Sequence, residues 1–300
     1  MYPTVLALAA AFISGTNNFI TKIAVTAVKD PILYTGIKNA VVAILLVGLF
    51  IAFKKGTEIK SLSRSQWTKL SLIGIVGGSV PFALYFTGLS MTSAINASLI
   101  HKTMFLWVLL LAYPLLKERL TKMQLLGVTA LFASNLFIGG FTGFKFNVGE
   151  LMIVAATLFW AVENIVAKKA LADISALTVV SARMVFGSTI LFVFLALQGR
   201  VAPIMSVSPI AWGWTLLTSA LLMGYVLAWF TALKHAPATY VAALLVSATV
   251  VTNVLSAVFV THAFTAQQFA SVTLCAVGTF LMVFYAKKTS GVTTSEKATV

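Results

Sequence analysis

Ten long apolar segments joined by short loops constrain this chain more than any other feature. A helix needs about 20 apolar residues to cross a hydrocarbon core about 30 Å thick, and ten segments meet that length. They cover approximately residues 4–28, 32–53, 67–89, 93–115, 121–140, 149–171, 175–198, 209–233, 237–261 and 265–286. Only 9% of the residues are charged, against about 25% in soluble domains. The sequence therefore predicts an all-α integral membrane protein with ten transmembrane helices.

Basic residues in the loops predict how the chain crosses the membrane. If the segments alternate in direction, fourteen Lys and Arg residues fall on one side and three, Lys29, Lys145 and Arg200, on the other. Because basic loops stay in the cytoplasm, we expect both termini to be cytoplasmic, in a plasma or bacterial inner membrane. The net charge of +14 then reflects topology and contact with membrane lipids, and no nucleic-acid partner is expected.

The two halves of the sequence share features at a nearly constant spacing. Asn17 and Asn18 precede Glu163 and Asn164 by 146 residues. Matches at an offset of 144 are residues 85–89 with 229–233, and Thr121 and Gln124 with Thr265 and Gln268. Five segments per half force the second copy to enter the membrane inverted, a common plan in secondary transporters. We expect repeats at residues 1–145 and 146–288, then a flexible cytoplasmic tail at 289–300. Since the first helix recurs and lacks a preceding basic region, it is expected to be structural rather than a signal peptide.

Some of these positions carry a family resemblance. Residues 118–127 (ERLTKMQLLG), residues 159–161 (FWA) and the duplicated five-segment layout resemble the EamA-type transporters of the drug/metabolite transporter (DMT) superfamily. The resemblance covers essentially all ten segments. It implies transport of a metabolite such as an amino acid, mostly by export, through a cavity between the halves. Two departures are Ser14, where the family often has Trp, and His262, where the repeat would place a second Glu.

Ionisable residues inside the apolar segments are the first candidates for a functional site, because each charge there costs about 2.5 kcal/mol or more. Glu163 is the only acid deep within a segment, and Arg183 lies at a similar predicted depth in the next one. We expect them to form an ion pair, which either only joins two helices or also takes part in coupling. Asn17 and Lys38 occupy the corresponding positions in the first half, where they are expected to interact.

Lys102 is predicted to contact the substrate. It lies about nine residues, or about 13 Å, inside the fourth segment, beside His101. An uncompensated cation in a cavity attracts an anionic group, so a substrate with a carboxylate is favoured; the alternative is a lysine held by backbone carbonyls. Lys22 and Lys38 are the other candidates for cations without an acidic partner, but because they lie near outer helix ends they are expected to extend to the interface.

Aromatic and amide side chains complete the predicted substrate site. Trp160 precedes Asn164 by one helical turn, so the two share a face, while Tyr85 and Trp229 are repeat mates. Packing between helices is the alternative role for the aromatic residues. The predicted substrate-binding set is Asn18, Tyr85, His101, Lys102, Trp160, Asn164 and Trp229.

The third segment contains the predicted hinge. Gly77 and Gly78 permit bending, and Pro81 removes a backbone donor and tends to kink a helix. The eighth segment has only Gly224 nearby, so the third should bend more. The alternative is that these glycines only permit close helix packing.

The leading functional hypothesis is a metabolite transporter that works by alternating access. Proton coupling through Glu163 or His101 and uncoupled diffusion are both compatible with the sequence, and no feature selects an oligomeric state. Alternatives are a transporter of nucleosides, amines or drug-like compounds, an intramembrane enzyme acting on lipids, and a structural membrane protein. Because His101, His235 and His262 are scattered and the acids are mostly peripheral, we expect no enzyme activity, metal or cofactor.

Overall fold

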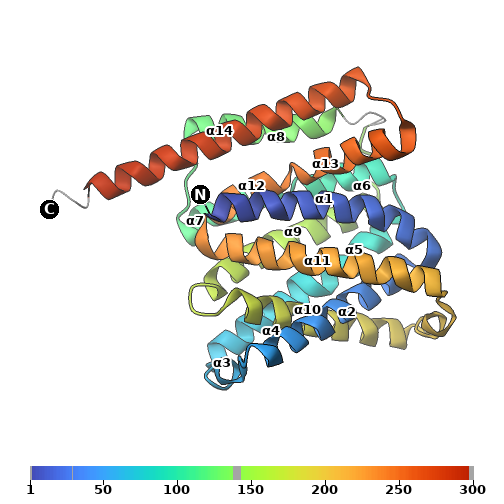
Figure 1. Cartoon of the computed structure of the whole chain (residues 1–300). Coiled ribbons are helices and arrows are strands. Elements are labelled where there is room, and N and C mark those ends of the chain that lie inside the picture. The colour runs from blue at the N-terminus through green and yellow to red at the C-terminus, as the bar shows by residue number, and fades with distance from the viewer. Residues whose placement is uncertain (1, 29, 138–142, 297–300) are drawn as a thin grey trace.

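The computed structural model describes residues 2–28, 30–137 and 143–296, without the side chains of residues 22–28, 94, 95, 206 and 287–296. Every regular element in these ranges is helical (Figure 1). The α-helices are α1 (Tyr2–Val28), α2 (Pro31–Ala52), α3 (Gly56–Lys60), α4 (Arg64–Gly78), α5 (Val80–Leu89), α6 (Ala94–Lys102), α7 (Met104–Leu116), α8 (Lys122–Leu136), α9 (Val148–Ala170), α10 (Ala176–Leu197), α11 (Pro209–His235), α12 (Ala238–Leu245), α13 (Ala248–Ser256) and α14 (Ala266–Glu296). A 3-10 turn at Ala202–Ser206 and a π-helical turn at Ala257–Thr261 complete the set.

Nine helical segments in the described residues are long and apolar enough to cross a membrane. The fifth predicted segment, residues 121–140, is described as α8. Its 15 residues measure about 22 Å at about 1.5 Å per residue, which is shorter than a hydrocarbon core of about 30 Å. Residues 138–142 lie outside the described ranges, so the tenth span stays a prediction.

The helices of the two halves pack against one another. α1 packs on α11, and the repeat mates of these two helices, α9 and the α4–α5 pair, pack on each other. α2 packs on α10, and α8 packs beside α14 along one edge of the bundle (Figure 1). Exchanging the two halves therefore reproduces the main helix contacts, as an inverted repeat requires. α1 begins and α14 ends at the same end of the bundle (Figure 1).

The repeated Thr-x-x-Gln sequence forms the same helix start in both halves. At α8 the Thr121 hydroxyl accepts from the Gln124 N–H at 3.2 Å, and the Gln124 side chain accepts from the Thr121 N–H at 3.0 Å. Thr265 and Gln268 make the same two bonds at α14, at 3.2 and 2.8 Å. This capping box satisfies backbone donors that a helix start leaves unpaired. The sequence repeat is thus explained by local helix chemistry.

Two spans are interrupted at matching positions. α6 ends at Lys102 before Thr103, and α12 ends at Leu245, shortly before Ser247. The Thr103 and Ser247 hydroxyls each donate to the carbonyl three residues earlier, both at 2.6 Å. Both backbone N–H groups also bond three residues back, as in a 3-10 turn. The turns follow the offset of 144 and bring backbone irregularity to the centre of the bundle.

Candidate functional site

The site is built around a third interruption, at Ser79 between α4 and α5. Pro81 has no N–H to donate to the carbonyl of Gly77, four residues earlier. That carbonyl instead accepts from Trp160 Nε1 at 3.1 Å and from Arg183 Nη2 at 2.9 Å. The third span is therefore broken, whereas its mate α11 is continuous. Movement at this break stays a prediction.

Gly77 and Gly78 allow the helices around this carbonyl to approach closely. A Cβ atom on Gly77 would collide with the carboxylate of Glu163. A Cβ on Gly78 would lie 2.7 Å from the Cα of Gly187 and 2.6 Å from the carbonyl oxygen of Arg183. Close packing, given above as the alternative to a hinge, accounts for both glycines.

Glu163 and Arg183 form a buried ion pair between α9 and α10. Arg183 Nε donates to Glu163 Oε1, and Nη2 donates to Oε2 at 3.4 Å. The two residues are 5% and 8% exposed. With the Gly77 carbonyl as a further acceptor, the pair ties α4, α9 and α10 together.

A cavity of about 460 Å³ lies beside this pair, between the two halves. All seven predicted substrate-binding residues line it: Asn18, Tyr85, His101, Lys102, Trp160, Asn164 and Trp229. Its other polar lining includes Ser14, Asn17, Thr21, Thr35, Lys38, Asn39, Thr249 and Thr252. Phe105, three residues after Lys102, is not part of this lining and is buried against Phe132.

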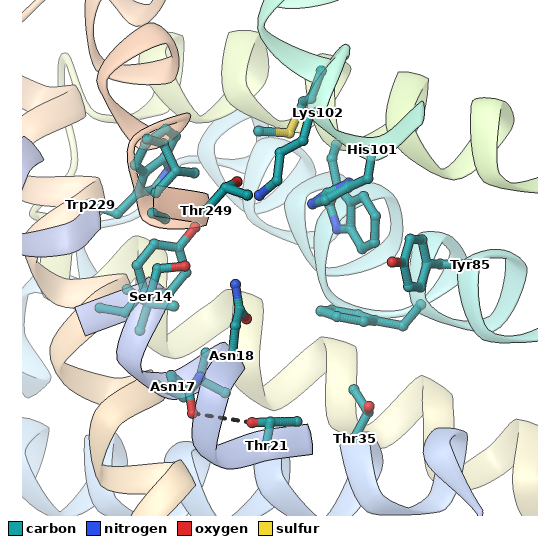
Figure 2. Close-up of a pocket in the computed structure, with 18 of the residues that line it drawn as sticks. Ser14, Asn17, Asn18, Thr21, Thr35, Tyr85, His101, Lys102, Trp229 and Thr249 are labelled. Atoms are coloured by element: carbon teal, nitrogen blue, oxygen red, sulfur yellow. Dashed lines mark hydrogen bonds between the residues drawn. The ribbon is translucent and has the colours of Figure 1, made fainter. Parts of the chain in front are cut away.

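Lys102 extends into the cavity from the C-terminal end of α6. Figure 2 shows its amine near Thr249 of α13, with the Asn18 amide directed at them from the opposite wall. Lys102 makes no ion pair or hydrogen bond within the described residues. The alternative of a lysine held by carbonyls is therefore not observed.

One wall of the cavity is aromatic. The His101 ring lies 4.7 Å from Trp160 and 5.6 Å from Tyr85 between centroids. Phe82 adds an edge contact with Trp160 at 5.2 Å. Trp229 lines the cavity from α11, in contact with Tyr225. The lysine amine thus lies beside an apolar aromatic surface.

Four residues of the lining carry buried polar atoms without a hydrogen-bond partner in the described part of the chain. They are both amide atoms of Asn39, Nδ1 of His101, Oδ1 of Asn164 and Oγ1 of Thr249. Leaving such a group unpaired costs about 1–3 kcal/mol. Their convergence on one cavity is typical of a binding site for a polar ligand.

Two predictions for the first half are wrong. Lys38 does not extend to the interface, because it is 9% exposed, lines the cavity and lies over the Tyr34 ring at 5.5 Å. Asn17 does not bond Lys38: its Oδ1 accepts from the Thr21 hydroxyl at 3.4 Å (Figure 2). The Lys22 side chain lies outside the described residues.

Contacts between the halves close the end of the bundle at which α1 begins. Glu118 accepts from the N–H groups of Ala238 and Thr239 at 2.8 and 2.9 Å. Glu58 accepts from the N–H and hydroxyl of Ser175 at 2.8 and 2.9 Å. Partial burial raises the pKa of Glu58, but these hydrogen bonds outweigh burial and hold it below the ordinary value. At the other end, Asp30 bonds Arg200 at 2.6 Å.

Thr249 and Asn39 were missed by sequence reasoning, which also misassigned Lys38. Polar residues at 249, 252, 253 and 256 follow the helical spacing of one face. That polar stripe in an otherwise apolar segment is the signal that identifies Thr249. Asn39 is a single amide next to Lys38, and no pattern in the sequence distinguishes it from a packing residue.

Comparisons with known proteins agree with this architecture. The family model described as "EamA-like transporter family" matches residues 1–140 and again residues 147–284, one copy in each half. A solved crystal structure superposes with a TM-score of 0.77 over 95% of this chain and 98% of its own, at 18% identity. At that identity the likeness shows the fold alone.

Three relatives carry the name "uncharacterized transporter". The Methanothermobacter thermautotrophicus protein is 28% identical over 38% of this chain and 35% of its own. YyaM of Bacillus subtilis is 27% identical over 59% of this chain and 58% of its own length. The Archaeoglobus fulgidus protein is 27% identical over 66% of this chain and 68% of its own length. The chain thus spans about a third to two thirds of these relatives' lengths. Because the family model covers nearly the whole chain, this protein belongs to the EamA-like transporter family and is a multi-pass membrane protein.

Proposed function

We propose that this protein is a secondary transporter that exports a small metabolite bearing a carboxylate, an amino acid or another organic acid. The observation that carries the proposal is the Lys102 amine, which lines the cavity without an ion pair or hydrogen bond in the described residues. Thr249 and Asn18 line the same cavity and offer further hydrogen bonds to a carboxylate (Figure 2). Export follows the direction that the family resemblance implies.

The aromatic wall supports a substrate with an apolar body next to its carboxylate. His101, Trp160 and Tyr85 contact one another beside Lys102. An amine substrate is disfavoured, because Lys38 and Lys102 line the same cavity and repel a cation.

Alternating access would open one end of the bundle while the other closes. Glu118 and Glu58 bond across the halves at one end, and Asp30 bonds Arg200 at the other. We assign the Glu118 end to the cytoplasm of a cell membrane, because the basic loops gather there. Proton coupling remains part of the proposal: the Glu163 carboxylate is occupied by Arg183, whereas Nδ1 of His101 has no partner in the described residues.

The test begins with purified protein. A thermal-shift screen against amino acids, organic acids, nucleosides and amines should detect binding of carboxylates. Transport of the best ligand in proteoliposomes is then measured for Lys102→Cys. We expect a loss of about tenfold to hundredfold, the value of a charged hydrogen bond.

Chemical restoration of the charge makes this test specific. The chain has one cysteine, Cys275, which is buried, so the new thiol can be modified selectively. Aminoethyl methanethiosulfonate should restore transport by Lys102→Cys, and the uncharged methyl reagent should not. Lys145→Cys, at an exposed position, is the matched control. Binding of amines without carboxylates, or full activity of unmodified Lys102→Cys, would refute the proposal.

A further inference from the structure

The two halves of the repeat differ in the partner that they give to one buried cation. Arg183 on α10 and Lys38 on α2 are repeat mates at an offset of 145, and Glu163 and Asn17 are mates at 146. In the second half the cation is paired with the Glu163 carboxylate. In the first half the mate of that carboxylate is the neutral Asn17, whose Oδ1 is bonded to Thr21. Lys38 therefore has the position of Arg183 without its counterion.

No acid among the described side chains is placed to neutralise Lys38 or Lys102. Of the seven Asp and Glu residues, five are engaged elsewhere, and Asp173 is exposed in the α9–α10 loop. The engaged acids are Asp30 with Arg200, Glu58 with Ser175, Glu118 with Ala238 and Thr239, Glu150 with Asn96, and Glu163 with Arg183. The seventh, Glu296, lies in the C-terminal tail, and its side chain is outside the described residues.

Lys38 and Lys102 project into the same cavity from different walls. Thr35, one turn before Lys38 on α2, lies opposite Lys102 in Figure 2. Next to Lys38, both amide atoms of Asn39 are buried without a partner in the described part of the chain. The lining thus has two polar subsites, Lys102 with Thr249 and Lys38 with Asn39. Its described charged side chains sum to two positive charges, because Glu163 and Arg183 cancel.

Two cations without counterions inside the protein, the buried Lys38 and the half-buried Lys102, are costly, and a bound anion removes that cost. On the basis of the proposed function, we infer that the substrate carries two anionic groups, one bound at Lys102 and the other at Lys38. The group at Lys38 takes the place of a protein carboxylate, because the first half has Asn17 where the second half has Glu163. A dicarboxylate and a phosphorylated carboxylate share this chemistry. A ligand with one carboxylate leaves the Lys38 subsite unfilled.

The experiment compares dianions with matched monoanions. Binding to purified protein is measured by thermal shift and calorimetry for dicarboxylates from malonate to adipate and for the monoamide of each. 3-Phosphoglycerate and glycerate, which lacks the phosphate, form the second arm. We expect at least one dianion to bind about tenfold to hundredfold more tightly than its matched monoanion, the factor of one charged hydrogen bond.

Variants of the Lys38 subsite then test the assignment. Lys38→Gln should abolish the preference for the dianion and leave binding of the monoanion within about twofold, whereas Lys38→Arg should retain the preference. Asn17→Glu should also abolish it, because it restores the carboxylate found in the second half. The exposed Lys145→Gln is the control. If Lys38→Gln does not fold, Asn17→Glu decides the question.

The outcomes separate this inference from the proposed function. If monoanions bind through Lys102 and no dianion is preferred, the inference is wrong and the function stands. An unchanged preference in both Lys38→Gln and Asn17→Glu also overturns it. If no carboxylate or phosphate binds, both fail. A preference that only the phosphate arm shows supports the inference and identifies a phosphorylated carboxylate.

Discussion

Gly77→Ala tests whether the centre of the bundle depends on close approach between α4 and the Glu163–Arg183 pair. The added methyl group would occupy the space of the Glu163 carboxylate. That carboxylate cannot move aside and keep both bonds to Arg183, which is itself held by the Gly77 carbonyl. The substitution should therefore separate a buried ion pair.

The expected cost follows from two opposing terms. Breaking a buried ion pair costs about 3–5 kcal/mol, because an uncompensated charge is left inside. Replacing a helical glycine by alanine stabilises a helix by about 1 kcal/mol. The free energy of unfolding should thus fall by about 2–4 kcal/mol.

Unfolding in mixed detergent micelles measures this difference. Gly48→Ala on α2 is the matched control, because a Cβ there meets no atom within 4 Å. In a Glu163→Ala, Arg183→Met background the clash and the pair are both absent, so Gly77→Ala should no longer destabilise. The reasoning is refuted if Gly77→Ala behaves like Gly48→Ala in the native background.

Two further predictions concern the end that Glu118 and Glu58 close. Glu118→Gln should lower the free energy of unfolding by about 1–2 kcal/mol, because the helix start at Ala238 and Thr239 loses a charged acceptor; Asp173→Asn, an exposed acid, should leave it unchanged in the same micelle assay. The contribution of Glu58 to the free energy of unfolding should be fully present above its unfolded pKa of about 4.3. It should be lost as the pH falls through the depressed pKa of the folded state. Glu58→Gln should therefore make the melting temperature less dependent on pH in this range. An identical dependence in the native protein and the variant would contradict this prediction.

Much of the fold could be predicted from the sequence because lipid constrains it locally. An apolar run of about 20 residues must be a helix, since its backbone groups find no partner in lipid. The repeat then predicted which helices of the two halves correspond to each other. In agreement with it, α1 packs on α11 and their counterparts, α9 and the α4–α5 pair, pack on each other. The cost of a charge in lipid likewise indicated that Glu163 and Arg183 face inward and meet.

The turns at Thr103 and Ser247 were not predicted, because neither residue is a strong helix breaker. Each turn depends on a hydroxyl that bonds back to its own helix, at Ile100 and Leu244. In most helices the same side chain is compatible with an unbroken backbone. Only the packed structure determines that α6 ends before Thr103 and that Phe105 is buried against Phe132.

The sequence alone predicted the helical class, the duplicated plan, the central ion pair and the place of Lys102 in the cavity lining. Only the tertiary structure decided where Lys38 points and that Thr249 and Asn39 share its cavity. Helical spacing predicts which residues lie on one face of a helix, but not which residues of other helices that face contacts. Lys38 meets Tyr34, whose hydroxyl bonds Thr218 of α11, 184 residues along the chain. Its direction is therefore set by contacts between the two halves, which no local pattern in the sequence contains.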